Sequence, residues 1–156
     1  MLSTELKSQI QGAYSRFLDA KGLKPRYGQR LMIAEVTKVL GAIKADDEGH
    51  RDGEPAVVAV EAGTGTGKTV AYSLAAIPTA KAAGKRLVIA TATVALQEQI
   101  VYKDLPDLMR NSGLNFSFAL AKGRGRYLCL SKLDQLLQEG EAQNATAQLF
   151  EEEGFR

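Results

Sequence analysis

Segment 61–69 carries the residue types best suited to chemistry. It reads Glu-Ala-Gly-Thr-Gly-Thr-Gly-Lys-Thr. Glycines let backbone N–H groups turn toward an anion, and a helix beginning near Lys68 would point its positive end at the same anion. The ammonium of Lys68 would reach the outer phosphates of a nucleotide, and the hydroxyl of Thr69 would bind Mg²⁺. The segment therefore predicts a phosphate-binding loop made of Ala62, Gly63, Thr64, Gly65, Thr66, Gly67, Lys68 and Thr69.

The loop departs from the usual pattern G-x-x-x-x-G-K-S/T at one position, because Ala62 stands where the first glycine is expected. A small side chain suffices at the start of such a loop, so we treat the departure as minor. The alternative is a Gly/Thr-rich turn that ends in a chance Lys-Thr pair. The apolar run before the loop and the helical pattern after it favour the phosphate loop.

Apolar runs around this loop predict an α/β fold. Residues 56–60 and 87–90 form continuous apolar runs, typical of strands buried on both faces, and 116–121 alternates large and small residues. A helix from Lys68 to about Ala83 links the first two, and we expect Pro78 to kink or split it. Strand, loop, helix and strand make a right-handed βαβ unit of a parallel sheet, with nucleotide at the carboxyl ends of the strands.

Helical patterns fill most of the remaining chain. The expected helices are 2–20, ended by Gly22; 29–44, following Pro25; 94–103, capped by Thr93; one from Asp104 to 111–113; one opened by a Ser131–Asp134 capping box and running through Leu137; and a weaker one at 141–150. In the first of these the apolar stripe, including Tyr14, is expected to serve packing.

Segment 45–54 has no large apolar residue and is expected to be an exposed loop. Within it, residues 47–50 spell Asp-Glu-Gly-His, the lettering of a helicase Walker B box. That chemistry needs carboxylates at the tip of a buried strand downstream of the phosphate loop. Because nothing apolar precedes these residues, we interpret them as a solvated loop.

Composition limits the number of domains, the cellular location and the disulfide bonds that the chain can have. The 156 residues, 45% hydrophobic and 24% charged, are typical of one globular domain. No apolar run approaches the roughly 18 residues of a membrane span, and no signal peptide is evident, so we expect a cytoplasmic protein without membrane association. The net charge of +2 is too small to argue nucleic-acid binding, and one cysteine excludes an internal disulfide.

Four blocks together resemble the N-terminal part of DinG-type ATP-dependent DNA helicases, which are iron–sulfur relatives of XPD in superfamily 2. The resemblance extends over about residues 5–137. It implies a RecA-like nucleotide-binding domain. The blocks are Arg26-Tyr27-Gly28-Gln29, the loop 61–69, Thr91 to Gln97, and Gly-Arg-Gly-Arg-Tyr-Leu-Cys at 123–129.

The first block matches the Q motif of this family. The resemblance implies that Gln29 reads the adenine of ATP, with Arg26 and Tyr27 beside the base. An amide suits this role because it donates and accepts at once, as the edge of adenine requires. The alternative is that Gln29 merely caps the second helix.

For Thr91, Thr93 and Gln97 the resemblance implies contacts to the backbone of single-stranded DNA, where hydroxyls bind phosphates without reading sequence. It also implies translocation in the 5′ to 3′ direction. Without the family, Thr93 is more often a helix N-cap.

Cys129 matches the first of four cysteines that hold a 4Fe–4S cluster in this family. The other three are missing from this sequence. The resemblance implies a cluster ligand whose partners lie beyond Arg156, whereas a lone cysteine is ordinarily a small buried hydrophobe.

No Walker B carboxylate pair or arginine finger follows Cys129, so the sequence resembles an N-terminal fragment with an incomplete first helicase domain. We expect such a fragment to be monomeric and to lack unwinding activity alone. The rival hypotheses are a stand-alone nucleotide-binding module and a P-loop phosphotransferase. The expected organisation is N-terminal helices with the Q motif at 1–44, an exposed loop at 45–55, the P-loop NTPase core at 56–122, and the start of an iron–sulfur-type insertion at 123–156.

Overall fold

The computed structural model describes residues 3–140. Contacts divide the chain into two compact units, Met1–Ala119 and Leu120–Arg156. None of the helices among the described residues has the length and apolar character needed to span a bilayer.

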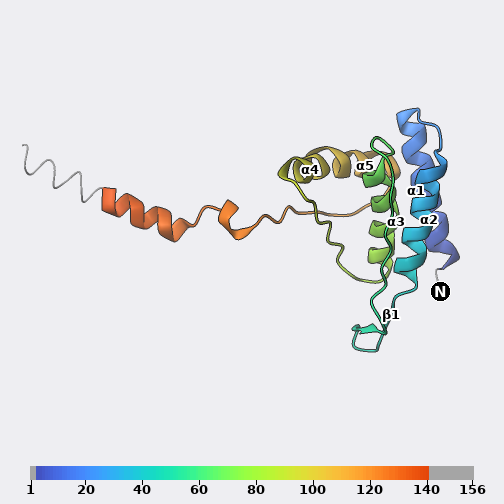
Figure 1. Cartoon of the computed structure of the whole chain (residues 1–156), viewed down its shortest axis with the longest axis horizontal. Coiled ribbons are helices and arrows are strands. Elements are labelled where there is room, and N and C mark those ends of the chain that lie inside the picture. Colours follow the sequence, from blue (N-terminus) through green and yellow to red (C-terminus); the bar gives the residue numbers. More distant parts are fainter. Residues whose placement is uncertain (1–2, 141–156) are drawn as a thin grey trace, which may run out of the picture. The chain divides into compact units, whose positions relative to one another are not determined.

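Three helices form the core of the first unit, α1 (Thr4–Lys21), α2 (Tyr27–Gly41) and α3 (Lys68–Ala82). Figure 1 shows them side by side, and α3 packs against both of the others. The predicted end of α1 is confirmed, because Gly22 caps it in the left-handed conformation with a φ of 62°. The core residues are Leu6, Ile10, Ala13, Tyr14, Phe17, Leu18, Met32, Ile33, Val36, Ala71, Leu74, Ala75, Leu108 and Leu114.

The second predicted helix ends earlier than expected. It stops at Gly41, and Ile43, which was expected on its buried stripe, is 45% exposed. Pro78 was expected to kink or split the third helix, and the split is wrong, since α3 runs through it unsplit. Proline removes only one backbone hydrogen bond here, and the helix is held by packing on α1 and α2. The hydroxyl of Thr79 also donates to Ala75 O at 2.7 Å.

The two helices predicted from 94 to 112 are continuous. α4 (Val94–Gln99) passes through a π-helical turn, η1 (Ile100–Asp104), directly into α5 (Leu105–Ser112). Asp104 makes no side-chain cap bond, because its backbone is already helical. The widened turn, in which Leu105 N donates to Ile100 O, precedes Pro106 and its missing N–H.

α5 is fastened to α1 by polar contacts. Arg16 Nε donates to Ser112 O at 2.8 Å, and Lys21 Nζ lies 3.0 Å from Asp107 Oδ2. Gly113 ends α5 in the left-handed conformation at φ 71°. These contacts join the first and last helices of this unit.

The predicted parallel sheet is absent from the part of the chain that the structure describes. Segments 56–60, 87–90 and 116–121 carry no strand pairing, and Val57 and Val88 are 81% and 85% exposed. A strand needs a neighbour for its N–H and C=O groups. Cavities separate these segments instead, one of about 420 Å³ between the first and second and one of about 1000 Å³ between the second and third.

The sheet that does form within residues 3–140 lies in the predicted exposed loop. β1 (Lys44–Ala45) pairs antiparallel with β2 (Arg51–Asp52), with Lys44 opposite Asp52. Gly49 turns at φ 81°, and Asp46 N donates to His50 O at 2.9 Å, which closes the hairpin. The loop assignment is corrected to a hairpin. The Asp-Glu-Gly-His letters lie in its solvated turn, as interpreted from the sequence.

The second unit contains a 3₁₀ turn, η2 (Arg124–Arg126), and helical residues 130–140. This helix starts before Ser131, because Leu133 N donates to Cys129 O at 3.0 Å, so the predicted capping box is wrong. The helix predicted at 141–150 lies outside the described residues.

Candidate nucleotide-binding site

Segment 61–69 has the backbone that its sequence predicts, a turn followed directly by a helix. Residues 64–66 form a turn, and α3 begins at Lys68 immediately after it. Gly65 and Gly67 adopt φ values of 73° and 75°, which other residues rarely take. The first turn of a helix leaves backbone N–H groups without intrahelical partners, and in α3 this turn directly follows the loop.

The ammonium of Lys68 is folded onto the loop. Its Nζ donates to Ala62 O and to Gly63 O, both at 2.8 Å, and Thr66 Oγ1 donates to Gly63 O at 2.9 Å. These bonds fold the loop around the ammonium group of Lys68. A phosphate group would compete with the two carbonyl oxygens for that ammonium group.

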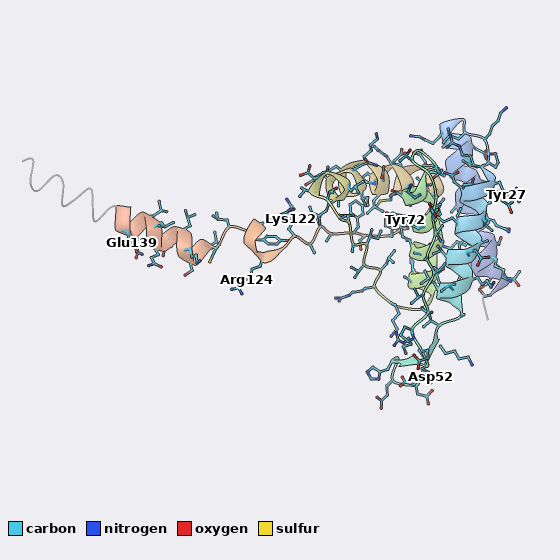
Figure 2. All side chains as sticks on the ribbon, in the orientation of Figure 1. Tyr27, Asp52, Tyr72, Lys122, Arg124 and Glu139 are labelled. Atoms are coloured by element: carbon cyan, nitrogen blue, oxygen red, sulfur yellow. The ribbon has the colours of Figure 1, made fainter. Side chains whose placement is uncertain are left out.

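Two residues of the block Arg26–Gln29, called below the adenine block after its expected role, contact the phosphate loop. Arg26 Nη1 donates to Gly65 O at 2.9 Å. Gln29 Nε2 lies so close to Gly67 that a Cβ on that glycine would stand 2.2 Å from it. The third member, Tyr27, is the first residue of α2 and is 78% exposed. Figure 2 labels its side chain. Tertiary contact thus brings Arg26 and Gln29 to the phosphate loop.

Gln29 does not cap α2, so that alternative is wrong. The N-cap residue is Arg26, and it makes no side-chain cap bond. Gln29 Oε1 instead accepts from the hydroxyl of Tyr14 on α1 at 3.1 Å. The apolar stripe predicted only a packing role for Tyr14. A phenol in such a stripe also indicates a polar contact, because its hydroxyl needs a hydrogen-bond partner when buried.

A cavity of about 420 Å³ brings Lys68 and Thr69 together with Thr91. Tyr72 of α3, labelled in Figure 2, lines the same cavity. The hydroxyl of Thr69 fits one ligand position of Mg²⁺, whose other ligands would be phosphate oxygens and water. Among residues 3–140 no cluster of three or more His, Cys, Asp or Glu side chains could hold a metal.

The residues expected to bind DNA lie at one turn. Thr93 Oγ1 accepts from Leu96 N at 3.2 Å, so Thr93 is the N-cap of α4, and Thr91 Oγ1 donates to Thr93 O at 3.2 Å. Thr91 and Gln97 also line the cavity of about 1000 Å³. The N-cap interpretation of Thr93 is confirmed, and a phosphate contact by the same exposed residue stays a prediction.

Cys129 is exposed, so the alternative of a small buried hydrophobe is wrong, and its assignment as a cluster ligand stays a prediction. It follows η2 in the second unit, where Lys122 N donates to the hydroxyl of Tyr127 at 2.8 Å. A 4Fe–4S cluster takes four thiolates, and this chain has one cysteine. The residues of this chain alone therefore do not fit an iron–sulfur cluster.

The loop, its lysine and the block Arg26–Gln29 have the arrangement of a candidate P-loop nucleotide-binding site. The profile of the DEAD/DEAH box helicase family matches residues 42–143, which is more than half of the chain. The chain therefore belongs to the DEAD/DEAH box helicase family.

Within this family the chain is homologous to DinG helicases, as the sequence blocks predicted. It is 42% identical over 149 residues, 94% of the chain, to the ATP-dependent DNA helicase DinG of Photobacterium profundum. It is 42% identical to DinG of Salmonella typhimurium and 41% identical to DinG of Escherichia coli K12, each over 136 residues and 86% of the chain. The chain covers 20% of the first relative and 18% of the other two, so it spans about a fifth of their length.

Proposed function

We propose that this chain forms the ATP-binding part of a longer DinG-type DNA helicase, called below the full-length helicase. That protein couples ATP hydrolysis to 5′ to 3′ movement along single-stranded DNA. Family membership and the relatives named DinG support this proposal. The chain alone lacks the Walker B carboxylates and arginine finger that hydrolysis needs, so we expect it to bind ATP without unwinding DNA.

The observation that carries the proposal is the junction of the adenine block with the phosphate loop. Arg26 is the N-cap residue of α2 and Gln29 lies in its first turn, yet one bonds Gly65 and the other lies close to Gly67. A nucleotide seated on the loop would have its phosphates at Lys68 and its base within reach of Gln29. A loop that bound phosphate alone would have no need of these contacts.

Each residue of the loop has a role in this proposal. Lys68 leaves the carbonyl oxygens of Ala62 and Gly63 and binds the outer phosphates of ATP. Thr69 offers its hydroxyl to Mg²⁺, which supplies charge neutralisation of those phosphates when bound. Backbone N–H groups from Gly63 to Gly67 line the phosphates.

Thr91, Thr93 and Gln97 form part of the DNA track in this proposal. The exposed N-cap Thr93 supports it, because the residue is accessible to a phosphate. Thr91 lines the same cavity as Lys68 and Thr69, which supports a path between the nucleotide and the DNA.

The parallel sheet forms, in this proposal, only in the full-length helicase. Segments 56–60, 87–90 and 116–121 have the apolar composition of buried strands, and cavities lie between them where neighbouring strands would pair. Hydrogen exchange tests this. Amides of 56–60 and 87–90 should be protected in the full-length helicase and exchange quickly in the 156-residue chain.

Cys129 is, in this proposal, one ligand of a 4Fe–4S cluster whose other three thiolates come from elsewhere in the full-length helicase. Its exposure and its position after the basic segment 122–126 support the assignment.

The test is ATP hydrolysis by the full-length helicase with and without single-stranded DNA. We expect DNA to accelerate hydrolysis, Lys68→Ala to abolish it, and Lys103→Ala, an exposed lysine of η1, to leave it unchanged. An equal rate of ATP hydrolysis with and without single-stranded DNA would overturn the assignment as a DNA motor. Wild-type hydrolysis by Lys68→Ala would overturn the phosphate-loop assignment. Unwinding by the 156-residue chain alone would favour a complete stand-alone enzyme.

A further inference from the structure

The hydroxyl of Tyr14 joins α1 to the adenine block. It donates to Gln29 Oε1 at 3.1 Å and accepts from Arg26 N at 3.3 Å. The tyrosine itself is 9% exposed and belongs to the core cluster. Because its ring is held by packing, the position of the hydroxyl is set by the fold of α1 and α2.

This pair of bonds determines which way the amide of Gln29 faces. A backbone N–H only donates, so the hydroxyl oxygen accepts from Arg26 and its proton is available for Gln29. That proton favours an oxygen over a nitrogen at this place. Oε1 therefore faces Tyr14, and Nε2 faces the phosphate loop at Gly67.

The direction of the amide matters to a residue that reads a base. The N6 amino group of adenine needs an acceptor and N7 needs a donor, and guanine presents an acceptor at the equivalent O6 position. A flipped amide would exchange donor and acceptor. The carbonyl oxygen of Gln29 retains a second lone pair beside the Tyr14 bond, so the base can still use it.

We propose that Tyr14 is a positioning residue for ATP recognition: its hydroxyl holds the amide of Gln29 in the one orientation that favours adenine over guanine. The inference rests on the proposed adenine-reading role of Gln29. A tyrosine that served packing alone would need its ring and not its hydroxyl.

The first experiment needs no nucleotide. In the ¹⁵N-labelled full chain, the side-chain amide signals of Gln29 are compared between wild type, Tyr14→Phe and Tyr102→Phe. Tyr102 is 71% exposed on η1 and serves as the matched loss of a hydroxyl. We expect Tyr14→Phe to move the Gln29 signals and Tyr102→Phe to leave them in place. Unmoved signals in Tyr14→Phe would overturn the proposal.

The second experiment measures binding of fluorescent ATP and GTP analogues to the same variants and to Gln29→Ala. Removing one hydrogen bond should weaken ATP binding about fivefold in Tyr14→Phe and leave GTP binding unchanged. The double variant Tyr14→Phe, Gln29→Ala should bind ATP no more weakly than Gln29→Ala alone, because both changes remove the same interaction.

The outcomes separate this inference from the proposed function. If Gln29→Ala loses the preference for ATP while Tyr14→Phe keeps it, the inference is wrong and the adenine role of Gln29 stands. If Gln29→Ala keeps the preference, the adenine role is wrong and the inference falls with it. Equal weakening of ATP and GTP by Tyr14→Phe, together with a lower Tm, would show a packing role only.

Discussion

The guanidinium of Arg26 donates a hydrogen bond of 2.9 Å to the carbonyl oxygen of Gly65, 39 residues further along the chain. Arg26 is the N-cap residue of α2, and Gly65 is one of the two left-handed glycines of the phosphate loop. The bond ties the conformation of the loop to the helix that carries Gln29. This bond and the close approach of Gln29 to Gly67 connect the phosphate loop to the start of α2.

Arg26→Ala should weaken binding of ATP about threefold to tenfold, because an exposed bond to a charged donor contributes roughly 1 kcal/mol. Arg26→Lys should recover only part of the loss, since an ammonium lacks the planar fork of a guanidinium. Titration with a fluorescent ATP analogue measures both.

Arg30→Ala is the matched control for this prediction. Arg30 is exposed one turn further along α2. If Arg26→Ala and Arg30→Ala bind ATP equally well, the bond to Gly65 has no part in nucleotide binding.

Gly67→Ala should destabilise the chain. Its φ of 75° costs a non-glycine residue about 1–2 kcal/mol, and the new Cβ would stand 2.2 Å from Gln29 Nε2. Thermal unfolding should show a Tm lower by about 5 °C. Adding Gln29→Ala to Gly67→Ala should recover the part of the loss that comes from the close contact.

Gly63→Ala controls for the loss of a loop glycine. Gly63 has no positive φ, and no atom lies within 4 Å of a Cβ placed there. An equal Tm for the two alanine variants would contradict the strain assigned to Gly67.

Substitutions of Thr93 can separate its role as the N-cap of α4 from its proposed contact with DNA. Asn and Asp both cap helices at least as well as Thr, so Thr93→Asn and Thr93→Asp should unfold at or above the wild-type Tm. Only Asp adds a negative charge, which DNA phosphates repel. In the full-length helicase, Thr93→Asp should bind single-stranded DNA about tenfold more weakly than Thr93→Asn at low salt.

Fluorescence anisotropy with a labelled oligonucleotide measures this difference at two salt concentrations. The gap between the two variants should narrow as salt rises, because ions screen the repulsion. Equal affinity of both variants at low salt would remove Thr93 from the DNA track.

Cys129→Ser should lower the iron content of the full-length helicase and remove the visible absorption of its cluster, because serine is a poor ligand for iron in such clusters. Ser131→Ala, two residues along in helical residues 130–140, should retain both. The 156-residue chain with its one cysteine should bind no cluster. Full iron loading of Cys129→Ser would exclude this residue as a ligand.

Local chemistry made several features predictable from sequence. Gly22 and Gly113 end α1 and α5 where predicted, because left-handed glycines stop helices regardless of what surrounds them. The phosphate loop is equally local, since Gly65 and Gly67 define its turn and Lys68 begins the helix. The four sequence blocks also predicted the helicase family, which the family match at 42–143 confirms.

Strand pairing was not predictable in this way. Segments 56–60 and 87–90 have the composition of buried strands, yet they remain unpaired among residues 3–140. Composition reports that a segment can be buried in a sheet, whereas pairing requires a neighbouring strand to take its N–H and C=O groups. Pro78 is the opposite case. Its residue type locally disfavours a helix, yet α3 runs through it unsplit because the helix packs against α1 and α2.

The sequence by itself determined the turn of the phosphate loop and the ends of α1 and α5, because each depends on residues close together in the chain. It determined the family through four short blocks. Only the tertiary structure decided that Tyr14 bonds Gln29 and that Arg26 bonds Gly65. A helical stripe shows that Tyr14 faces inward but does not name the group its hydroxyl will meet. That partner is set by how α1, α2 and α3 pack, which periodicity alone does not encode.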